Sequence, residues 1–339
     1  MLLVITAIFI LFFAPLWLTF LLAVGVAIFL LRADADLCTL IAHQMMIQKK
    51  KSPISYPQQF VGKTVLVTGA SSGLGEYLCY ELAKQGAKLV LCARRETELQ
   101  RVRQGCANSD KHVTVVLDLS DTDSHKKIAA DAIEKAGGRI DVCVQNAGRS
   151  ARGLVEDVLL KVDQDQLHLN TIGTISLTKA FLPHFIKNQG GHFVVVSSVA
   201  GKLGAPSSAN YSASKAALMN YFSALRIETV DQGLHVTLVC PGPVASEGAN
   251  NAITATGGTA KDEGCPTSSY DKRRMPTKRF AELMAAAMHA KLHETWISPH
   301  PELLYTYLAQ YSPLFYSFLS TKLGPGRVRQ FRAAQKKGS

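Results

Sequence analysis

Tyr211 and Lys215 are the residues whose types and spacing best suit proton-transfer chemistry. They lie four positions apart in residues 210–229, a run typical of a helix, and residues i and i+4 of a helix share a face. A free tyrosine titrates near pH ~10, and a cation held beside it lowers that pKa. The pair would therefore exchange a proton with a carbonyl or alcohol. Because the spacing also arises by chance, a solvated lysine beside a packed tyrosine is the alternative.

The elements around this pair follow a regular order between about residues 60 and 300. Short apolar runs that favour strands occupy residues 64–68, 88–92, 113–117, 140–144, 192–197, 234–240 and 296–298. Helical patterns lie between them at residues 74–86, 96–106, 122–136, 163–188 and 210–229. Such alternation is typical of parallel βαβ units, and continuously apolar strands indicate a sheet covered on both faces. The sequence predicts an α/β fold with one doubly wound, Rossmann-like sheet of seven parallel strands.

The first predicted strand leads into a turn of small residues, which is followed at once by a helix. Small residues let the backbone approach a phosphate, and the helix N-terminus supplies N–H donors and a positive dipole. At the head of a βαβ chain, this pattern favours a dinucleotide site over a tight structural turn. The predicted cofactor contacts are Gly69, Ser71, Ser72, Gly73, Leu74 and Gly75.

Two arginines follow the second predicted strand. An acidic residue at this place in a dinucleotide fold binds the ribose 2′-hydroxyl of NAD, whereas an arginine accommodates a 2′-phosphate. Arg94 and Arg95 occupy the position, and Glu96 comes only at the start of the next helix. We therefore expect NADP(H) as the cofactor.

Polar and small residues also follow the third and fourth predicted strands. In doubly wound sheets the ligand lies at the carboxyl ends of the strands. This places five further residues at the predicted cofactor site: Asp118, Leu119, Asn146, Ala147 and Gly148.

The N-terminal segment has no charged side chain from Met1 to Leu31. About 20 apolar residues span a bilayer, whereas a cleaved signal peptide has a shorter apolar stretch and usually a basic start. We therefore expect an uncleaved membrane-anchor helix before the catalytic domain. Arg32 and the basic run at residues 49–51 follow this segment and no basic residue precedes it, which favours a cytosolic catalytic domain.

The formal net charge is +11. The basic residues gather after the anchor and in the tail, at Lys322, Arg327, Arg329, Arg332, Lys336 and Lys337. An anionic membrane surface and simple solubilisation both explain this charge. No nucleic-acid-binding motif accompanies it, so nucleic acid is not an expected partner.

The cysteines and histidines do not suggest a metal site. The seven cysteines form no Cys-x-x-Cys pair, and Cys92, Cys143 and Cys240 fall in predicted buried strands, where cysteine acts as a small apolar residue. Four histidines have no metal-ligand spacing: His168, His184, His192 and His235. We expect no bound metal.

These observations divide the chain into four parts. They are a membrane anchor at residues 1–31, a connector at 32–59, a catalytic domain at 60–300 and an aromatic, basic extension at 301–339. The connector is expected to contain a helix around residues 37–46. Residues 247–275 are the predicted substrate loop, rich in Gly, Thr and Ser between residues 249 and 272. The tail aromatics could cover the substrate, lie on a membrane or form core or dimer surface: Tyr305, Tyr307, Tyr311, Phe315, Tyr316 and Phe318.

Taken together, these motifs resemble the short-chain dehydrogenase/reductase family over residues 60–245. Residues 68–75 match its TGxxxGxG signature and residues 211–215 its YxxxK signature. Residues 146–148 match its NNAG motif except that Gln145 replaces the first Asn. Residues 241–246 resemble its PGxVxT segment, with Ser246 in place of Thr. This last match adds Pro241, Gly242, Val244 and Ser246 to the predicted cofactor contacts.

The resemblance implies four catalytic residues: Asn170, Ser198, Tyr211 and Lys215. By this resemblance, Ser198 and Tyr211 donate hydrogen bonds to the substrate oxygen. Lys215 lowers the tyrosine pKa and binds the nicotinamide ribose. Asn170 holds a water that connects Lys215 to solvent. A homodimer through the helices that contain Asn170 and Tyr211 is also implied.

The N-terminus and the tail resemble a membrane-anchored subgroup of this family. That resemblance implies an NADPH-dependent reductase of the endoplasmic reticulum membrane, acting on a lipophilic small molecule such as a retinoid or steroid carbonyl. Two alternatives stay open. One is an NAD(P)-dependent alcohol or hydroxysteroid dehydrogenase that works in the oxidative direction, and the other is a non-catalytic, cofactor-bound membrane scaffold.

Overall fold

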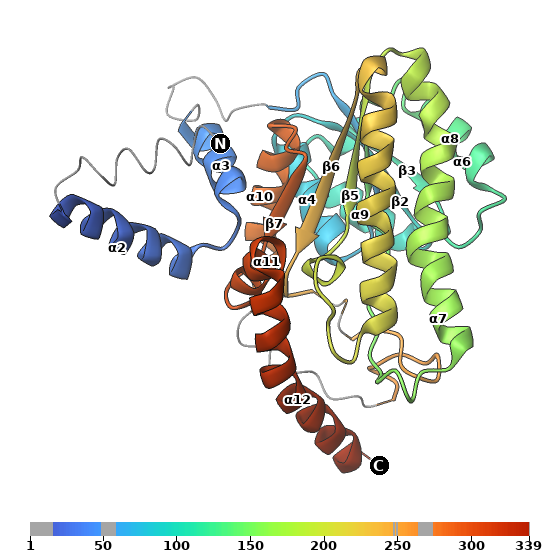
Figure 1. Cartoon of the computed structure of the whole chain (residues 1–339). Helices are drawn as coiled ribbons and strands as arrows, with labels where there is room; N and C mark the ends of the chain where they lie inside the picture. The colour runs from blue at the N-terminus through green and yellow to red at the C-terminus, as the bar shows by residue number, and fades with distance from the viewer. Residues whose placement is uncertain (1–15, 49–58, 247, 249, 264–273, 339) are drawn as a thin grey trace.

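A seven-stranded parallel sheet forms the centre of the protein (Figure 1), as the sequence predicts. The computed structural model describes residues 16–48, 59–246, 248, 250–263 and 274–338. The strands lie in the order β3-β2-β1-β4-β5-β6-β7 and every pair is parallel. Their bounds are Thr64–Thr68 (β1), Lys88–Ala93 (β2), Val113–Val116 (β3), Val142–Gln145 (β4), Gly191–Val196 (β5), Leu234–Pro241 (β6) and Glu294–Ile297 (β7).

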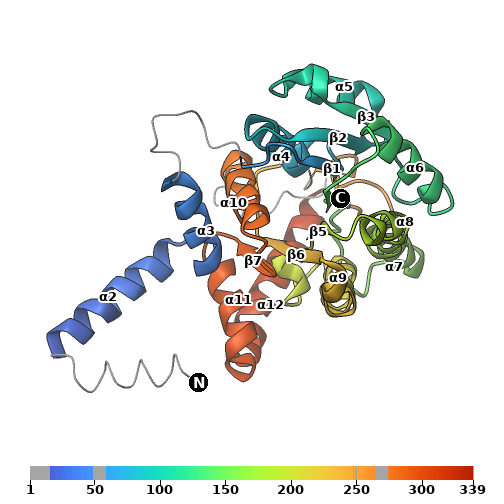
Figure 2. The same cartoon turned by 90° about the horizontal axis from the view of Figure 1, so that it is seen from above.

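Helices cover both faces of the sheet (Figure 2), because successive strand residues point in opposite directions. Val65 and Val67 pack in one apolar layer, whereas Leu66 packs in the other. The first layer contains α4 (Gly73–Lys84), α5 (Glu96–Gly105) and α10 (Thr277–His289). The second contains α6 (His125–Lys135), α8 (Thr174–Lys187) and α9 (Ala209–Thr229). The strand order reverses between β1 and β4, which places the ligand-binding crevice at their carboxyl ends.

The long helix predicted at residues 163–188 is confirmed, because residues 160–187 are helical without a break, but it contains a turn that the sequence did not predict. It runs through α7 (Leu160–Leu167), the π-helical turn η3 (His168–Gly173) and α8. Gly173 permits this packing, because an added Cβ would collide with the backbone carbonyl of Leu119. Such π-turns change the direction of side chains and are frequent at functional sites. In this chain the turn contains Asn170.

The predicted start of the helix at residues 122–136 is early. Residues 122–124 form turns, the Ser124 hydroxyl donates to the Asp121 carbonyl at 2.9 Å, and α6 begins only at His125. Its predicted end is confirmed, because Gly137 and Gly138 follow with φ of +83° and +88°, a region that favours glycine.

The N-terminal part contains α2 (Leu16–Arg32) and α3 (Leu37–Gln48). Residues 1–15 of the predicted anchor lie outside the described residues. Within the part of the chain that is described, no helix combines the length and hydropathy needed to cross a membrane.

Helix α3 packs beside the edge strand β7. The backbone N–H of Asp36 donates to the Trp296 carbonyl at 2.8 Å, and the Trp296 N–H donates back to the Asp36 carboxylate at 2.6 Å. The same carboxylate accepts from the backbone N–H and hydroxyl of Thr39 at 3.0 and 2.7 Å. Asp36 therefore caps α3 and binds it to backbone groups that an edge strand otherwise leaves unpaired.

The C-terminal extension forms α11 (Glu302–Tyr311) and α12 (Pro313–Gly338), which descends past the carboxyl edge of the sheet (Figure 1). Leu303 of α11 is buried in the second apolar layer, and Tyr307 packs against Trp296 with ring centroids 5.1 Å apart. The tail aromatics have different environments. Tyr305 and Tyr316 line the cavity described below, whereas Tyr311, Phe315 and Phe318 are exposed.

The described part of the predicted substrate loop is anchored to the rest of the domain. The Ile253 N–H donates to the Ser150 carbonyl at 2.9 Å, and the Arg152 N–H donates to the Ile253 carbonyl at 2.7 Å. Ala252 and Thr254 are buried. Residues 247, 249 and 264–273 of this loop lie outside the described residues.

Candidate active site

Helix α9 brings Tyr211 and Lys215 to the carboxyl edge of the sheet on one face, as their spacing predicts. The Lys215 Nζ lies 5.9 Å from the centroid of the Tyr211 ring. It donates to the Val196 carbonyl at 2.8 Å, and the Ser197 hydroxyl donates to the Lys215 carbonyl at 2.9 Å. These bonds fix both the side chain and the helix turn of Lys215 against the end of β5.

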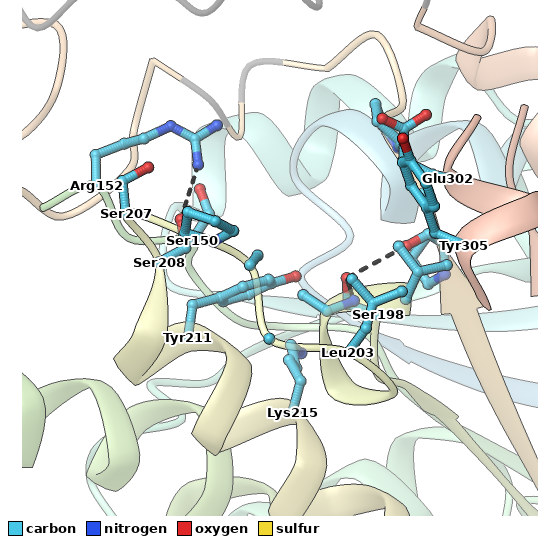
Figure 3. A pocket seen from close by; sticks show the side chains of 18 of the residues that line it. Ser150, Arg152, Ser198, Leu203, Ser207, Ser208, Tyr211, Lys215, Glu302 and Tyr305 are labelled. Carbon is cyan, nitrogen blue, oxygen red and sulfur yellow. Dashed lines mark hydrogen bonds between the residues drawn. The ribbon is translucent and has the colours of Figure 1, made fainter. Parts of the chain in front are cut away.

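Ser198 lies between this pair and the end of β6. Its buried hydroxyl accepts from the Ala200 N–H at 3.1 Å, donates to the Pro241 carbonyl at 3.3 Å and lies within hydrogen-bonding reach of Tyr211. Figure 3 shows the Tyr211 hydroxyl pointing toward Ser198. Two hydroxyl groups from different elements therefore converge on one point.

A cavity of about 730 Å³ opens beside these hydroxyl groups. Ten of the residues predicted from the sequence line it: Leu74, Asn146, Gly148, Ser198, Tyr211, Lys215, Pro241, Gly242, Val244 and Ser246. The other predicted residues do not line it; they are Gly69, Ser71, Ser72, Gly73, Gly75, Arg94, Arg95, Asp118, Leu119, Ala147 and Asn170. The reacting groups therefore lie in this cavity. The predicted residues outside it could hold the remainder of a nucleotide along the carboxyl ends of the strands.

The pKa of Tyr211 differs in direction from the sequence-based prediction. Burial raises it above its usual value, whereas the hydrogen bond with Ser198 and the charge of Arg152 act to lower it. The expectation that Lys215 leaves this pKa below its usual value is therefore wrong for the protein without ligands. The physical reason is that removing the phenolate from water costs more free energy than its interactions with Ser198 and Arg152 supply.

Lys215 is also affected by burial. Desolvation of the ammonium group lowers its pKa from 10.5 to about 8. The lysine is thus mostly charged at neutral pH and titrates at moderately alkaline pH.

Asn170 links the cavity wall to helix α9. Its side-chain oxygen accepts from the Arg149 N–H at 2.9 Å. Its amide nitrogen donates to the Arg149 carbonyl at 2.9 Å and to the Ser214 hydroxyl at 3.1 Å. The side chain therefore positions the loop after β4 and the turn of α9 between Tyr211 and Lys215. The water-holding role implied by the family resemblance stays a prediction.

The glycine-rich turn fits a closely approaching phosphate. Gly69 and Gly73 have φ of +66° and +58°, a region that L side chains rarely adopt. An added Cβ at Gly69 would lie 2.9 Å from the Asn146 amide nitrogen, and one at Gly75 would collide with the Gly69 carbonyl. The turn leads directly into α4, whose first N–H groups have no acceptor within the helix. This geometry suits the pyrophosphate of a dinucleotide.

Arginines surround the carboxyl end of β2. Arg94 and Arg95 are exposed, and Arg95 donates to the Ser71 hydroxyl at 3.3 Å. Arg101, which the sequence analysis did not select, donates to both carboxylate oxygens of Glu76 at 2.8 and 3.0 Å and to the Ser71 carbonyl at 3.4 Å. Arg95 and Arg101 thus lie against the phosphate turn.

The predicted residues after β3 and β4 take part in local hydrogen bonds. Asp118 accepts from the backbone N–H and hydroxyl of Ser120 at 2.9 and 2.7 Å. The N–H groups of Asn146 and Ala147 both donate to the Thr68 hydroxyl at 3.0 Å, which fixes this loop beside the phosphate turn. Gln145, the departure from the family motif, is buried and donates to Thr178 at 3.1 Å.

The segment after β6 closes the same edge. Ser246 lies against the phosphate turn, because an added Cβ at Gly73 would be 3.3 Å from the Ser246 Cβ. Gly242 is required where the chain passes β7, since a Cβ there would collide with the Ser298 hydroxyl.

Several cavity residues were not predicted from the sequence. Arg149 and Arg152 come from the loop after β4, and α11 and α12 contribute Glu302 and Arg327. Tyr305 of α11 also lines the cavity, and it is one of the tail aromatics for which covering the substrate was one of the alternatives. The position of Arg149, directly after the Asn146–Gly148 motif, could have indicated its role. No local pattern marks Glu302 or Arg327, because they reach the cavity through the packing of the extension.

Comparison with known proteins agrees with this geometry. Residues 63–256 match the short chain dehydrogenase family. The chain belongs to the short-chain dehydrogenase/reductase family. It is similar to dehydrogenase/reductase SDR family member 7 of Mus musculus, with 41% identity over 308 residues that cover 89% of this chain and 88% of the relative. The Homo sapiens protein of the same name is 40% identical over 309 residues, with the same coverage.

Solved structures of this family share the fold. Levodione reductase has a TM-score of 0.63 at 22% identity, covering 72% of this chain and 98% of its own. An alcohol dehydrogenase from Thermococcus sibiricus, in complex with 5-hydroxy-NADP, has a TM-score of 0.59 at 22% identity and covers 70% of this chain and 97% of its own. These likenesses show that this short-chain dehydrogenase/reductase shares the fold of both solved structures.

Proposed function

We propose that the protein is a membrane-anchored, NADP(H)-dependent carbonyl reductase that acts on lipophilic ketones or aldehydes. The observation that carries the proposal is the convergence of the Ser198 and Tyr211 hydroxyl groups at one end of the cavity, with Lys215 held beside them. Such donors stabilise negative charge that grows on a carbonyl oxygen.

The residues of the chain would divide the work as follows. NADPH supplies the hydride when bound. Ser198 and Tyr211 hold the substrate oxygen, and Tyr211 gives its proton to that oxygen as it becomes an alkoxide. Lys215 stabilises the tyrosinate that results, and Asn170 keeps the loop after β4 aligned with α9. The reverse path, with Tyr211 as the base, oxidises an alcohol.

The proposed preference for NADP(H) rests on charge at the end of β2. Arg94 and Arg95 are both exposed, and Arg95 contacts Ser71 of the phosphate turn. Arginine side chains can donate to a 2′-phosphate. The glycine turn and the N-terminus of α4 would hold the pyrophosphate.

The lipophilic substrate class is supported by the wall opposite the sheet. Leu203 of the loop after β5 and Leu319, Leu323 and Phe331 of α12 line the cavity. An apolar surface within the cavity favours a substrate with apolar groups of its own.

Membrane attachment, residence in the endoplasmic reticulum and a cytosolic catalytic domain are part of the proposal. The uncharged N-terminal segment and the basic residues that follow it support them. Protease protection of the full chain in microsomes tests the topology.

A homodimer through α7, η3, α8 and α9 is also proposed. Leu160 of α7, Ile172 of η3 and Ile227 of α9 are exposed apolar residues. Sedimentation of detergent-solubilised protein would measure the oligomeric state, and a monomer would contradict this part of the proposal.

The proposed reductase activity is tested by measuring how fast the full chain consumes NADPH with a panel of lipophilic ketones and aldehydes. The same panel is assayed with NADH, and the corresponding alcohols with both oxidised cofactors. We expect turnover with NADPH and weaker turnover with NADH. Faster reaction with NAD than with NADP would overturn the cofactor assignment.

Tyr211→Phe is the matched catalytic control. It removes one hydroxyl and keeps the ring that packs beside Lys215. We expect turnover to fall by about 100-fold or more while NADPH affinity changes little. A variant that retains full activity would contradict the role of Tyr211 as the proton donor.

A further inference from the structure

Glu302 lines the cavity but has no role in the proposed reaction. It belongs to the first turn of α11, and its side chain is only 13% exposed. Its Oε1 atom is buried and has no hydrogen-bond partner. A buried acceptor without a partner is costly, and such exceptions in native proteins call for an explanation.

Arg327 of α12 faces the same oxygen. Its Nη2 lies 3.9 Å from the Glu302 Oε1, which is an ion-pair distance but too long for a direct hydrogen bond. Both residues line the cavity, together with Tyr305 and Tyr316. Figure 3 shows Glu302 and Tyr305 on the side of the cavity that lies across Ser198 from Tyr211. The reacting groups and this second polar group therefore occupy different parts of one cavity.

We propose that Glu302 and Arg327 recognise a hydroxyl group on the substrate, distinct from the carbonyl that is reduced. A hydroxyl both donates and accepts, so it can donate to the Glu302 carboxylate and accept from the Arg327 guanidinium. A guanidinium has five N–H donors and can add this contact while it keeps others. The inference rests on the proposed reductase function and narrows its substrate class to lipophilic hydroxy-ketones or hydroxy-aldehydes.

Charge in the cavity favours a neutral hydroxyl over an ionised group. Arg149, Arg152 and Arg274 also line the cavity, so an ammonium group would meet four guanidinium groups including Arg327. A carboxylate beside Glu302 would meet a like charge within the same wall. A hydroxyl satisfies the buried carboxylate oxygen without either repulsion.

The test uses two matched probes, an ω-hydroxyalkyl phenyl ketone and the alkyl phenyl ketone of the same length, each in a series of increasing chain length. Dissociation constants are measured by calorimetry on the full chain with NADP⁺ present, so that the ketone cannot be reduced. For the best-fitting length, we expect the hydroxyl group to tighten binding by about 10- to 100-fold, as for a hydrogen bond to a charged group.

Glu302→Leu should remove this preference and bind the parent ketone as well as the wild type does. Glu302→Gln retains an acceptor and should keep part of the preference. Glu156→Leu is the matched control. Glu156 pairs at 2.7 Å with Arg332 of α12, the helix that also contains Arg327, but Glu156 does not line the cavity. It should leave the preference unchanged.

Three results would overturn the inference. They are a wild type that binds both probes equally at every length, a Glu302→Leu variant that weakens both probes equally, and a Glu156→Leu variant that reproduces the Glu302→Leu effect. The last two would show that Glu302 serves only to hold α12 in place. Because binding is measured without reduction of the ketone, a preference for the hydroxy-ketone in a protein that reduces neither probe would uphold this site and count against the proposed reductase function instead.

Discussion

The Lys215 ammonium donates a 2.8 Å hydrogen bond to the carbonyl of Val196, the last residue of β5. A lysine buried at the end of a strand is expensive to keep charged, and its pKa of about 8 reflects that cost. The buried charge of Lys215 therefore lowers the stability of the folded protein, and the proposed catalytic role explains why a lysine occupies this position.

Lys215→Met should therefore stabilise the ligand-free protein at pH 7 while it abolishes turnover. Removing the buried ammonium group stabilises the fold by up to about 3 kcal/mol. Loss of the hydrogen bond to Val196 offsets part of this, so we expect the free energy of unfolding to rise by about 1–2 kcal/mol. Urea unfolding with a parallel activity assay measures both effects.

The pH dependence gives this prediction a second check. Because the folded pKa of Lys215 lies below its unfolded value, the wild type gains stability as the pH rises from about 8 toward 10. Lys215→Met lacks this gain, so the difference between the two proteins should shrink over that range. A difference that grows with pH would contradict the assignment.

Arg152 should influence the proton affinity of Tyr211. Its charge acts to lower the Tyr211 pKa, so Arg152→Met should raise that pKa and shift the pH profile of alcohol oxidation to higher pH. At neutral pH we expect the oxidation rate to fall severalfold. Arg152→Lys keeps a positive charge and should shift the profile less; equal shifts in the two variants would mean that Arg152 acts through packing.

Arg95 should contribute to the choice between NADP and NAD. Arg95→Ala removes a donor beside Ser71 and should weaken NADP⁺ binding by about 10- to 100-fold while leaving NAD⁺ binding nearly unchanged. Fluorescence titration of both cofactors measures the ratio. Arg139→Ala is a suitable control, because Arg139 pairs with Asp141 at the opposite edge of the sheet. Parallel losses for both cofactors would contradict a 2′-phosphate contact.

Asp36 should be a major stabilising contact of the N-terminal part. Asp36→Ala leaves the Trp296 and Thr39 N–H groups without their acceptor and should lower the free energy of unfolding by about 2–4 kcal/mol. Asp34→Ala removes a half-exposed ion pair with Arg279 and should cost less than about 1 kcal/mol. Equal losses in thermal or urea unfolding would show that α3 is not held through Asp36.

The sequence by itself determined the sheet, the phosphate turn and the pair on α9. Each depends on neighbours within a few residues: apolar runs make buried strands, glycine permits positive φ at Gly69 and Gly73, and a spacing of four places Tyr211 and Lys215 on one helix face. Ser198, the third predicted catalytic residue, followed from its distance along the chain to Tyr211 in the family resemblance.

Tertiary structure decided the rest. The π-turn at Asn170 depends on the close approach of Gly173 to Leu119, which are 54 positions apart and share no local pattern. The Tyr211 pKa depends on how completely packing removes water, and composition does not record that. Likewise, Glu302 and Arg327 reach the cavity only because α11 packs on the sheet and α12 turns back along its carboxyl edge. Local sequence preferences fix short-range geometry, but the environment of a side chain is set by long-range packing.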